Sequence, residues 1–503
     1  MTDVTVARPG AAPAPVPSIG ARLDRLPIGP THRTVTLVVG LGLFFDFFDS
    51  NLSGTISKVL QAEFAVSGTS LKLVLASAFV GQFVGAVWLG RLADRVGRRR
   101  AFLINLGIYS FFTLLGAFSP NAAWLIVTRF LAGIGIGAEL ALSDSYLSEL
   151  LPARKRGRFI AWAYTIAFCG VPAVGVAALW FAPRMVLGID GWRWLFVLGA
   201  LGAVVVWVLR RRLIESPRWL AANGRVAEAE ALVSRMEAEA GLTGRPAQSG
   251  SAGWPGEPGP AGPVGAARPV GSPRLGLGLL FRPPYRRRTV MLWILSILSV
   301  TAYYGFGTLA PQVLAAKGYG IVQGLAYTAV AFVGYPLGSL LSVPLMDRVE
   351  RKVLLAGSAA AMAACGIGFG LAGSGLAVAT FGIGYTLLSN VFANASHVYL
   401  AEQYPTEVRA SAAGAVYALS RLSAAAVPFV LLPVLYAGGA TWLFVVVAGC
   451  VAVLVADVLL LGDRTTGVSV DRIAASPGAD AAGPGPAARG PVRAPHAGPG
   501  AAG

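Results

Sequence analysis

The sequence predicts an all-α membrane protein in which twelve transmembrane helices form two six-helix bundles. Of its 503 residues, 55% are hydrophobic and only 13% are charged, and the mean hydropathy is +0.65. A soluble protein cannot bury that much apolar surface, so lipid is the expected solvent. About a dozen stretches reach the roughly 20 apolar residues that cross a bilayer core of ~30 Å. Marker residues also recur at one fixed offset along the chain.

The apolar stretches fall into two sets of six, separated by a long polar segment. The expected spans of the first bundle, residues 34–212, are 34–57, 71–92, 100–118, 122–146, 158–182 and 192–212. Those of the second bundle, residues 287–462, are 287–312, 321–345, 352–373, 375–400, 408–434 and 438–461. We expect 1–33 to be a disordered cytoplasmic N-terminus and 463–503 a disordered cytoplasmic tail. Segment 213–286 is predicted to be a charged cytoplasmic helix followed by a Gly- and Pro-rich flexible linker.

The net charge of +17 is concentrated in alternate loops. Basic residues follow the second, fourth and eighth spans and flank the long middle segment, whereas the intervening loops carry few. Cytoplasmic loops of membrane proteins carry the excess of Lys and Arg. Both termini and the middle segment are therefore expected in the cytoplasm, and the protein is expected in the cell (inner) membrane as a multi-pass chain. The same pattern accounts for the charge without a nucleic acid partner.

An internal repeat relates the two bundles. Gly81 recurs as Gly334 and Gly85 as Gly338, each 253 residues later. Further pairs at the same offset are Asp94 and Asp347, Arg95 and Arg348, Arg98 and Arg351, Tyr146 and Tyr399, Glu149 and Glu402, Pro152 and Pro405, and Arg156 and Arg409. An offset of six helices gives both bundles the same orientation, which predicts parallel halves related by an axis along the membrane normal. Such halves can rock about a site that lies between them.

Several motifs identify a family. The stretch GQFVGAVWLGRLADRVGRRR and its degenerate copy GSLLSVPLMDRVERK resemble the signature loops of the major facilitator superfamily. RFLAGIGIGAELALSDSYLSELLPARKRGR and LIESPRWLAANGR resemble its branch of sugar porters and metabolite–proton symporters. The resemblance implies the major facilitator fold and a cytoplasmic gate of charge contacts; alternatively, the arginines only set the topology. The implied gate residues are Gly90, Asp94, Arg95, Gly97, Arg98, Glu149, Arg156, Asp347, Arg348, Glu402 and Arg409.

Charged residues inside the first bundle are candidates for proton coupling, because such residues are costly in a membrane. Counting helix rise places Asp49 of the first span and Arg129 of the fourth at similar depth. An ion pair there would let protonation of the aspartate release the arginine, and proton-coupled relatives with this pattern imply that relationship. Asp46 and Glu139 are further candidates. A purely structural salt-bridge network remains an alternative, as does a packed, protonated Glu139.

The second bundle carries Arg421 near the middle of its eleventh span. A buried guanidinium favours a carboxylate, and the pattern resembles aromatic-acid and nicotinate-type symporters; neutralisation by a protein carboxylate is the alternative. The other candidate substrate contacts are Trp162, Tyr164, Tyr303, Tyr304, Asn390 and Asn394, although each can equally serve helix packing. His397 is expected to be structural.

These observations predict a proton-coupled symporter that takes up a small organic metabolite, most simply an organic anion, by alternating access. The proton gradient is the expected energy source, with no cofactor, no catalytic residue and no metal site, and a monomer is expected. The alternatives are a proton-driven exporter, suggested by Gly170, Pro172 and Gly175; a sugar porter; and, remotely, a sensor that does not transport. Sugar porters typically show glutamines in the fifth and seventh helices, and the stretches AWAYTIAFCGVPAVG and LWILSILSVTAYYGFG of those spans contain none. An enzyme is not expected, because no nucleophile–base pair or nucleotide loop is present.

Overall fold

The computed structural model describes residues 18–65, 68–152, 154–242, 281, 285–404 and 406–463. The side chains of residues 94, 347, 401, 402 and 406–411 also fall outside this description. Four predicted gate residues belong to that group: Asp94, Asp347, Glu402 and Arg409. The predicted linker from 243 to 280 and the predicted tail from 464 onward likewise lie outside the described residues.

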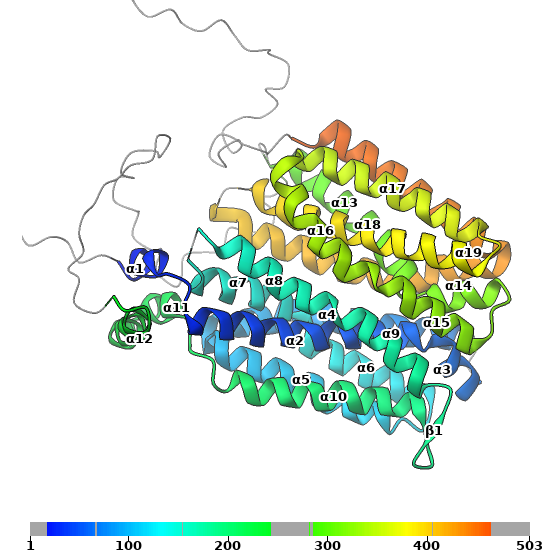
Figure 1. Ribbon diagram of the computed structural model, residues 1–503, viewed down its shortest axis with the longest axis horizontal. Coiled ribbons are helices and arrows are strands. Elements are labelled where there is room, and N and C mark those ends of the chain that lie inside the picture. The colour runs from blue at the N-terminus through cyan, green and yellow to red at the C-terminus, as the bar shows by residue number, and fades with distance from the viewer. Residues whose placement is uncertain are drawn as a thin grey trace, which may run out of the picture.

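The helices form two bundles that lie as two layers with nearly parallel axes (Figure 1). The first consists of α2 (Pro30–Thr55), α3 (Ser57–Glu63), α4 (Gly68–Val96), α5 (Arg98–Ala117), α6 (Ala122–Gly137), α7 (Glu139–Leu150), α8 (Arg156–Phe168), α9 (Gly170–Phe181) and α10 (Gly191–Arg210). The second consists of α13 (Arg286–Gly307), α14 (Ala310–Ala316), α15 (Ile321–Phe332), α16 (Gly334–Arg348), α17 (Arg351–Leu371), α18 (Gly375–Glu402) and α19 (Thr406–Leu461). A short hairpin of β1 (Met185–Val186) and β2 (Ile189–Asp190) joins α9 to α10.

Eleven helices in the described part of the chain are long and apolar enough to cross a membrane. Three of them are the interrupted pairs α6–α7, α8–α9 and α15–α16. The last one lies in α19 and contains two spans, because Gly439 leaves helical geometry with φ 77° and ψ −175°. The predicted fold of twelve spans in two bundles is thereby confirmed.

The internal repeat is visible in the contacts. A Cβ atom on Gly81 would collide with the carbonyl of Phe130, and one on Gly334 with the carbonyl of Ile383, again 253 residues later. The helix backbones meet closely at these glycines, so α4 packs on α6 as α16 packs on α18. Arg98 donates to the carbonyl of Ala93, and the equivalent Arg351 donates to that of Met346.

The N-terminal segment differs from the prediction. Residues 1–33 were expected to be disordered, but α1 (Ile19–Arg25) is helical and packs on α12 (Val226–Glu239), beside α11 (Pro217–Ala222). Leu23 and Leu26 are buried against Val233 and Met236 of α12. Arg22 donates to both carboxylate oxygens of Glu237, at 3.0 and 2.6 Å. Two leucines one turn apart and one arginine, in a segment rich in Pro and Ala, are too short a pattern to predict a helix.

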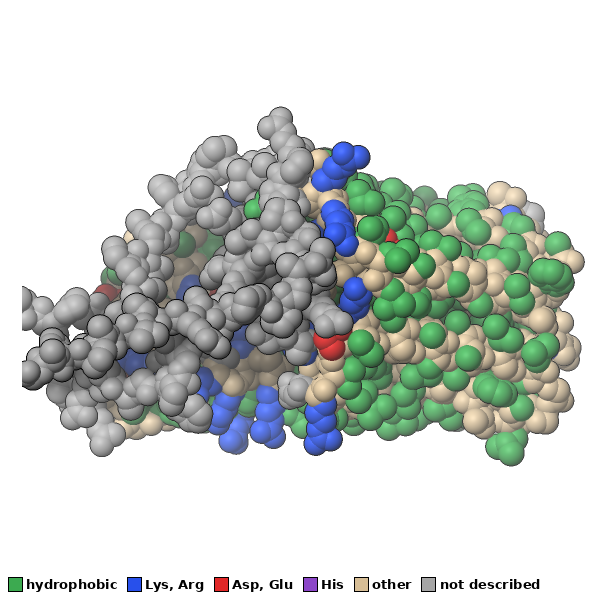
Figure 2. Space-filling model, turned by 90° about the horizontal axis from the view of Figure 1, so that it is seen from above, with side chains coloured by type: hydrophobic (Ala, Val, Ile, Leu, Met, Phe, Trp, Pro, Cys, Tyr) green, Lys and Arg blue, Asp and Glu red, His purple; other side chains and the backbone are tan. Residues whose placement is uncertain are grey.

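Charge is distributed unevenly between the two ends of the bundle. Figure 2 shows that Lys and Arg side chains on the visible face gather toward the end where α1, α11 and α12 lie, whereas the remainder of that face is mainly hydrophobic. We call this end the basic end. At the opposite end the two bundles are in close contact: Gly54 of α2 meets the backbone of Thr308, and Gln312 of α14 donates to Ser57 at 3.2 Å.

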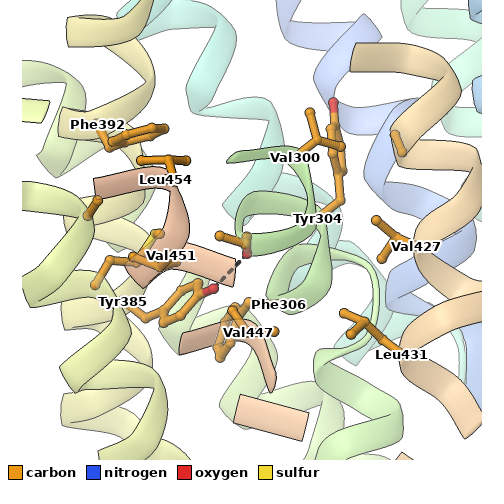
Figure 3. Packing of buried hydrophobic residues seen from close by; sticks show 14 of the residues in the cluster. Val300, Tyr304, Phe306, Tyr385, Phe392, Val427, Leu431, Val447, Val451 and Leu454 are labelled. Atoms are coloured by element: carbon orange, nitrogen blue, oxygen red, sulfur yellow. Dashed lines mark hydrogen bonds between the residues drawn. The ribbon is translucent and has the colours of Figure 1, made fainter. Parts of the chain in front are cut away.

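The core of the second bundle surrounds α13. Tyr385 donates to the carbonyl of Ala302 at 2.6 Å and stacks on Phe306, with ring centroids 4.7 Å apart. Figure 3 shows this pair on one side of α13, while Tyr304 lies beside Val300 on another. Tyr304 is also part of this core, and it contacts Phe79 of the first bundle at 4.7 Å between ring centroids.

Candidate functional site

Asp49 and Arg129 form the ion pair that the sequence predicted. Arg129 Nη1 of α6 lies 2.8 Å from Asp49 Oδ2 of α2, and both side chains are almost fully buried. Thr113 of α5 connects them: its hydroxyl accepts from Arg129 at 2.9 Å and donates to Asp49 at 3.3 Å. The guanidinium also lies 4.9 Å from the centre of the Phe196 ring. Protonation of Asp49 would remove the charge that holds Arg129 in this position.

A second buried ion pair was missed in the sequence. Glu139 of α7 pairs with Arg210 at the last residue of α10, and neither side chain is exposed beyond 2%. The guanidinium of Arg210 occupies the space that a side chain on Gly42 would fill, and lies 4.2 Å from the ring centre of Phe102. Arg210 is the first of three consecutive arginines, a pattern typical of a cytoplasmic loop. Its burial in an ion pair was therefore not predicted. The available signal was Glu139 itself, because a buried carboxylate needs a partner.

Asp46 lies close enough to both pairs to interact with them electrostatically. It is 4% exposed and lies in the electrostatic field of Glu139, Arg210 and Asp49. It also interacts electrostatically with Tyr417 of α19 in the other bundle. The four residues predicted for proton coupling thus occupy one charged region of the first bundle, and Arg210 completes it.

Arg421 of α19 is buried where the two bundles face each other. Its Nη1 donates to the hydroxyl of Tyr304 at 2.6 Å, and its guanidinium lies 4.5 Å from the ring centre of Tyr417. Within the described part of the chain, the groups that contact this guanidinium are tyrosines, and no carboxylate forms an ion pair with it. Neutralisation by a protein carboxylate, the alternative considered for this residue, is therefore not what the described residues show.

Aromatic rings from both bundles surround this region. Tyr164 of α8 donates to Asp144 at 2.9 Å and faces the ring of His397 of α18 at 6.3 Å. Tyr303 of α13 lies 5.0 Å from Tyr304 and 5.4 Å from Tyr335, measured between ring centroids. His397, for which a structural role stays a prediction, is exposed and faces Tyr164 of the opposite bundle.

The remaining predicted substrate contacts lie elsewhere. Trp162 is 49% exposed and lies roughly 160° around the helix from Tyr164, so the structure does not bring it to this region. Asn394 donates to Ser342 of α16 at 2.7 Å and joins two helices of the same bundle. Asn390 is fully buried against Gly338 of α16, and neither atom of its amide has a hydrogen-bond partner among the described residues.

The predicted gate residues that are described lie at the basic end. Arg98 pairs with Glu149 at 3.0 Å, and its backbone N–H donates to Glu215 at 2.9 Å. Gly97 adopts φ 96°, a conformation that favours glycine, with Glu215 against it. Glu215 thus contacts two of the predicted gate residues, and sequence reasoning missed it although it lies in the quoted stretch LIESPRWLAANGR.

The other described gate residues make weaker contacts. Arg156 lies 3.6 Å from Asp24 of the segment containing α1. Arg95 and Arg348 are exposed, and Gly90 has open space beside it. Among the described residues of the predicted gate, the charge contacts therefore centre on Arg98, Glu149 and Glu215.

Comparisons with known proteins agree with this architecture. A family model described as "Sugar (and other) transporter" matches residues 35–475. The niacin transporter NiaP of Acinetobacter baylyi is 30% identical over 90% of this chain and 99% of its own length. The gentisate transporter of Corynebacterium glutamicum is 26% identical, over 79% of this chain and 80% of its own length.

Solved structures support the same fold. A partially occluded, inward-open structure of the xylose transporter XylE from E. coli superposes with a TM-score of 0.67. It is 20% identical and covers 87% of this chain and 99% of its own. With two bundles, a buried arginine where they face each other and a family match over most of its length, the chain belongs to the Sugar (and other) transporter family of the major facilitator superfamily and is a multi-pass membrane transporter of small molecules.

Proposed function

We propose that this transporter is a proton-coupled symporter that takes up a small aromatic carboxylate by alternating access. The observation that carries the proposal is Arg421, a buried guanidinium between the bundles whose described contacts are Tyr304 and Tyr417 rather than a carboxylate. A buried cation is stabilised by an anion, and the planar guanidinium matches a carboxylate with two parallel hydrogen bonds.

The surroundings of Arg421 favour an aromatic substrate. Tyr164, Tyr303 and Tyr304 bring rings from both bundles to the same region. Aromatic side chains stack on flat rings and contribute about 0.5–1.5 kcal/mol per pair beyond area burial. Niacin and gentisate, which name two of the relatives, are both aromatic carboxylic acids.

A sugar fits this region less well. Hexose recognition needs several amide and carboxyl groups, and α8, α9 and α13 contain no Gln. The nearby groups that we identify are instead hydroxyls, rings and one guanidinium. Substrates with one charged end and one flat apolar body match this chemistry better.

Proton coupling is attributed to the charged region of the first bundle. Asp49 and Arg129 are buried together, so protonation of Asp49 and the freedom of Arg129 are linked. The transmembrane proton gradient would then supply the energy. The basic end is proposed to be cytoplasmic, with both termini on that side of the cell membrane, because Lys and Arg concentrate there. We further propose that the protein works as a monomer.

The test uses purified protein in liposomes without a membrane potential or pH gradient. Addition of nicotinate, benzoate or gentisate outside the liposomes should produce alkalinisation of the external medium, whereas xylose should not. Asp49→Asn should lose this signal but retain exchange of labelled substrate, because the fixed neutral side chain cannot carry the proton. Arg158→Lys, at an exposed position outside the predicted gate and the charged region, serves as the control. Acidification on addition of a lipophilic amine, with silence for every acid, would instead establish a proton-driven exporter.

A further inference from the structure

The β1–β2 hairpin between α9 and α10 exposes an apolar tip. Met185, Leu187 and Ile189 are 71%, 84% and 44% exposed. The two strands pair Met185 with Asp190 and Val186 with Ile189, which leaves Leu187 and Gly188 as a two-residue turn. Both turn residues have positive φ, 55° and 73°.

Leucine is an unfavourable residue for this turn. A two-residue hairpin with positive φ at both positions favours Asn-Gly or Asp-Gly, because a branched aliphatic side chain is strained in the left-handed region. Leu187 therefore combines backbone strain with a nearly fully exposed apolar side chain. Contact of the tip with an apolar phase would remove the cost of exposing Leu187, and that gain would offset the backbone strain of the turn.

The position of the hairpin indicates which phase that is. In Figure 1 the hairpin extends sideways from the ends of α9 and α10, across the helix direction and past α10, rather than along the bundle axis. α10 has 20 residues, about 30 Å of helix, which matches the hydrocarbon core from Arg210 at the basic end to Gly191. The hairpin thus starts at the level where hydrocarbon meets headgroups, beside the lipid-facing surface of α10, where Leu198, Leu201 and Val205 are exposed.

Side chains next to the hairpin are those expected at this level. Trp180 is exposed, and the guanidinium of Arg184 lies 5.0 Å from its ring centre. Trp194 donates its indole N–H to the carbonyl of Val186 at 3.0 Å and holds the first strand against α10. Tryptophan is enriched at membrane–water interfaces, because its ring is apolar and its N–H needs a polar partner.

We propose that the β1–β2 hairpin is a lipid anchor, whose tip inserts Met185, Leu187 and Ile189 into the interface of the leaflet opposite the basic end. The apolar side chains contact acyl chains while Arg184 stays at the headgroup level. The anchor fixes the ends of α9 and α10, and with them the first bundle, relative to the bilayer surface. It depends on the chain crossing a bilayer, and not on the substrate or on proton coupling.

Spin labels at single cysteines test the proposal in full-length protein lacking Cys169, Cys365 and Cys450, in liposomes of phosphatidylethanolamine and phosphatidylglycerol. A label at Leu187→Cys should collide more often with oxygen, which partitions into lipid, than with a water-soluble nickel chelate. The control is Gly373→Cys in the exposed loop between α17 and α18, at the same end, where the nickel chelate should dominate. Equal behaviour at both positions overturns the proposal.

A second variant separates anchoring from folding of the hairpin. Leu187→Asn creates the Asn-Gly pair that this turn prefers, so the hairpin should stay folded while its apolar tip is lost. A label at Met185→Cys should then shift from oxygen-dominated to nickel-dominated collisions, and an unchanged ratio contradicts a role for the tip. Protection of Leu187→Cys from both reagents in native membranes, with a water-like ratio in liposomes, would assign the surface to a protein partner and exclude the lipid anchor.

Discussion

At the scale of single residues, Arg421 is the strongest test of substrate chemistry. Lysine keeps the positive charge but loses the planar fork that contacts Tyr304 and stacks on Tyr417. We expect Arg421→Lys to raise the KM for an aromatic carboxylate by about tenfold, which corresponds to about 1.4 kcal/mol. Uptake of labelled substrate into liposomes measures this. An unchanged KM would remove Arg421 from the anion site.

The Glu139 and Arg210 pair predicts a particular pattern of stabilities. Removing one partner of a buried ion pair leaves the other charge unpaired and costs about 3–5 kcal/mol. Arg210→Met should therefore lower the unfolding temperature strongly, and the double variant with Glu139→Gln should recover part of the loss. Thermal unfolding in detergent measures the wild type, both single variants and the double variant, with Arg158→Met at an exposed position as the control. Additive losses would show that the two side chains act independently.

Residue pairing was predictable only where both partners stood out from their surroundings. Asp49 and Arg129 are single charges within apolar stretches, so counting helix rise placed them together. Arg210 and Glu215 belong to charged segments whose bulk composition is explained by topology, and their specific contacts depend on how α10 and α11 pack. Trp162 shows that closeness in sequence can mislead: it is two residues from Tyr164 but lies on nearly the opposite side of the same helix.

At the scale of helices, the glycines of the repeat set the distance between axes. A side chain on Gly81 would meet the backbone of Phe130 and Gly133, which cannot move without shifting α6. Gly81→Ala should therefore destabilise the fold by about 1–3 kcal/mol, as overpacking does. Gly107→Ala, where nothing lies nearby, should have little effect. Equal unfolding temperatures for the two variants would contradict close packing at Gly81.

The docking of α1 on α12 should depend on pH. The hydrogen bonds from Arg22 lower the pKa of Glu237 below its usual value. Because the folded-state pKa is depressed, the stabilisation is present above the unfolded-state pKa, near 4.3, and is lost as pH falls through the folded-state value. The pair is partly exposed to solvent, so its contribution is at most about 1 kcal/mol.

Hydrogen exchange of α1 measures this dependence. Protection should decrease as pH falls below about 4.3 in the wild type, once the intrinsic pH dependence of exchange is removed. Glu237→Gln should show low protection throughout, because its side chain cannot ionise. The same acid-induced change in both proteins would mean that another group controls the docking of α1.

At the scale of the whole molecule, contacts at the end opposite the basic end hold the two bundles in the observed arrangement. Gln312 is almost fully buried, donates to Ser57 at 3.2 Å, and lies 3.5 Å from the hydroxyl of Tyr436. Gln312→Leu leaves Ser57 without this donor, which disfavours the closed contact. We expect a cysteine at Thr308 to be labelled faster from that side of the membrane. If the closed contact is weakened by about 1 kcal/mol, the labelling rate should rise about fivefold.

Gln323 supplies the matched control for this prediction. Gln323→Leu changes the same residue type at an exposed position near that end and should leave the labelling rate unchanged. Slower labelling in Gln312→Leu would mean that the glutamine opposes closure. The equal accessibility of Thr308 in both variants would place the closing contacts elsewhere, for example at Gly54.

The overall architecture was predictable because composition, span length and a repeat of 253 residues each point to the same two bundles. Features that lie within one helix, or that recur at the repeat distance, can be recognised from the sequence alone. The contacts between the two bundles, such as Tyr304 with Phe79 or His397 with Tyr164, join residues that no periodicity relates. They follow only from the packing of the complete fold.

The placement of Arg421 has an electrical consequence. The buried pairs Asp49–Arg129 and Glu139–Arg210 are each neutral, whereas Arg421 forms no ion pair with a carboxylate among the described residues. With one carboxylate and one proton bound, the carrier has the same net charge as when empty. A voltage of 100 mV, which would do ~2.3 kcal/mol of work on each charge moved, then does no net work over a transport cycle. For such one-to-one transport, the pH difference alone would set how far the substrate accumulates.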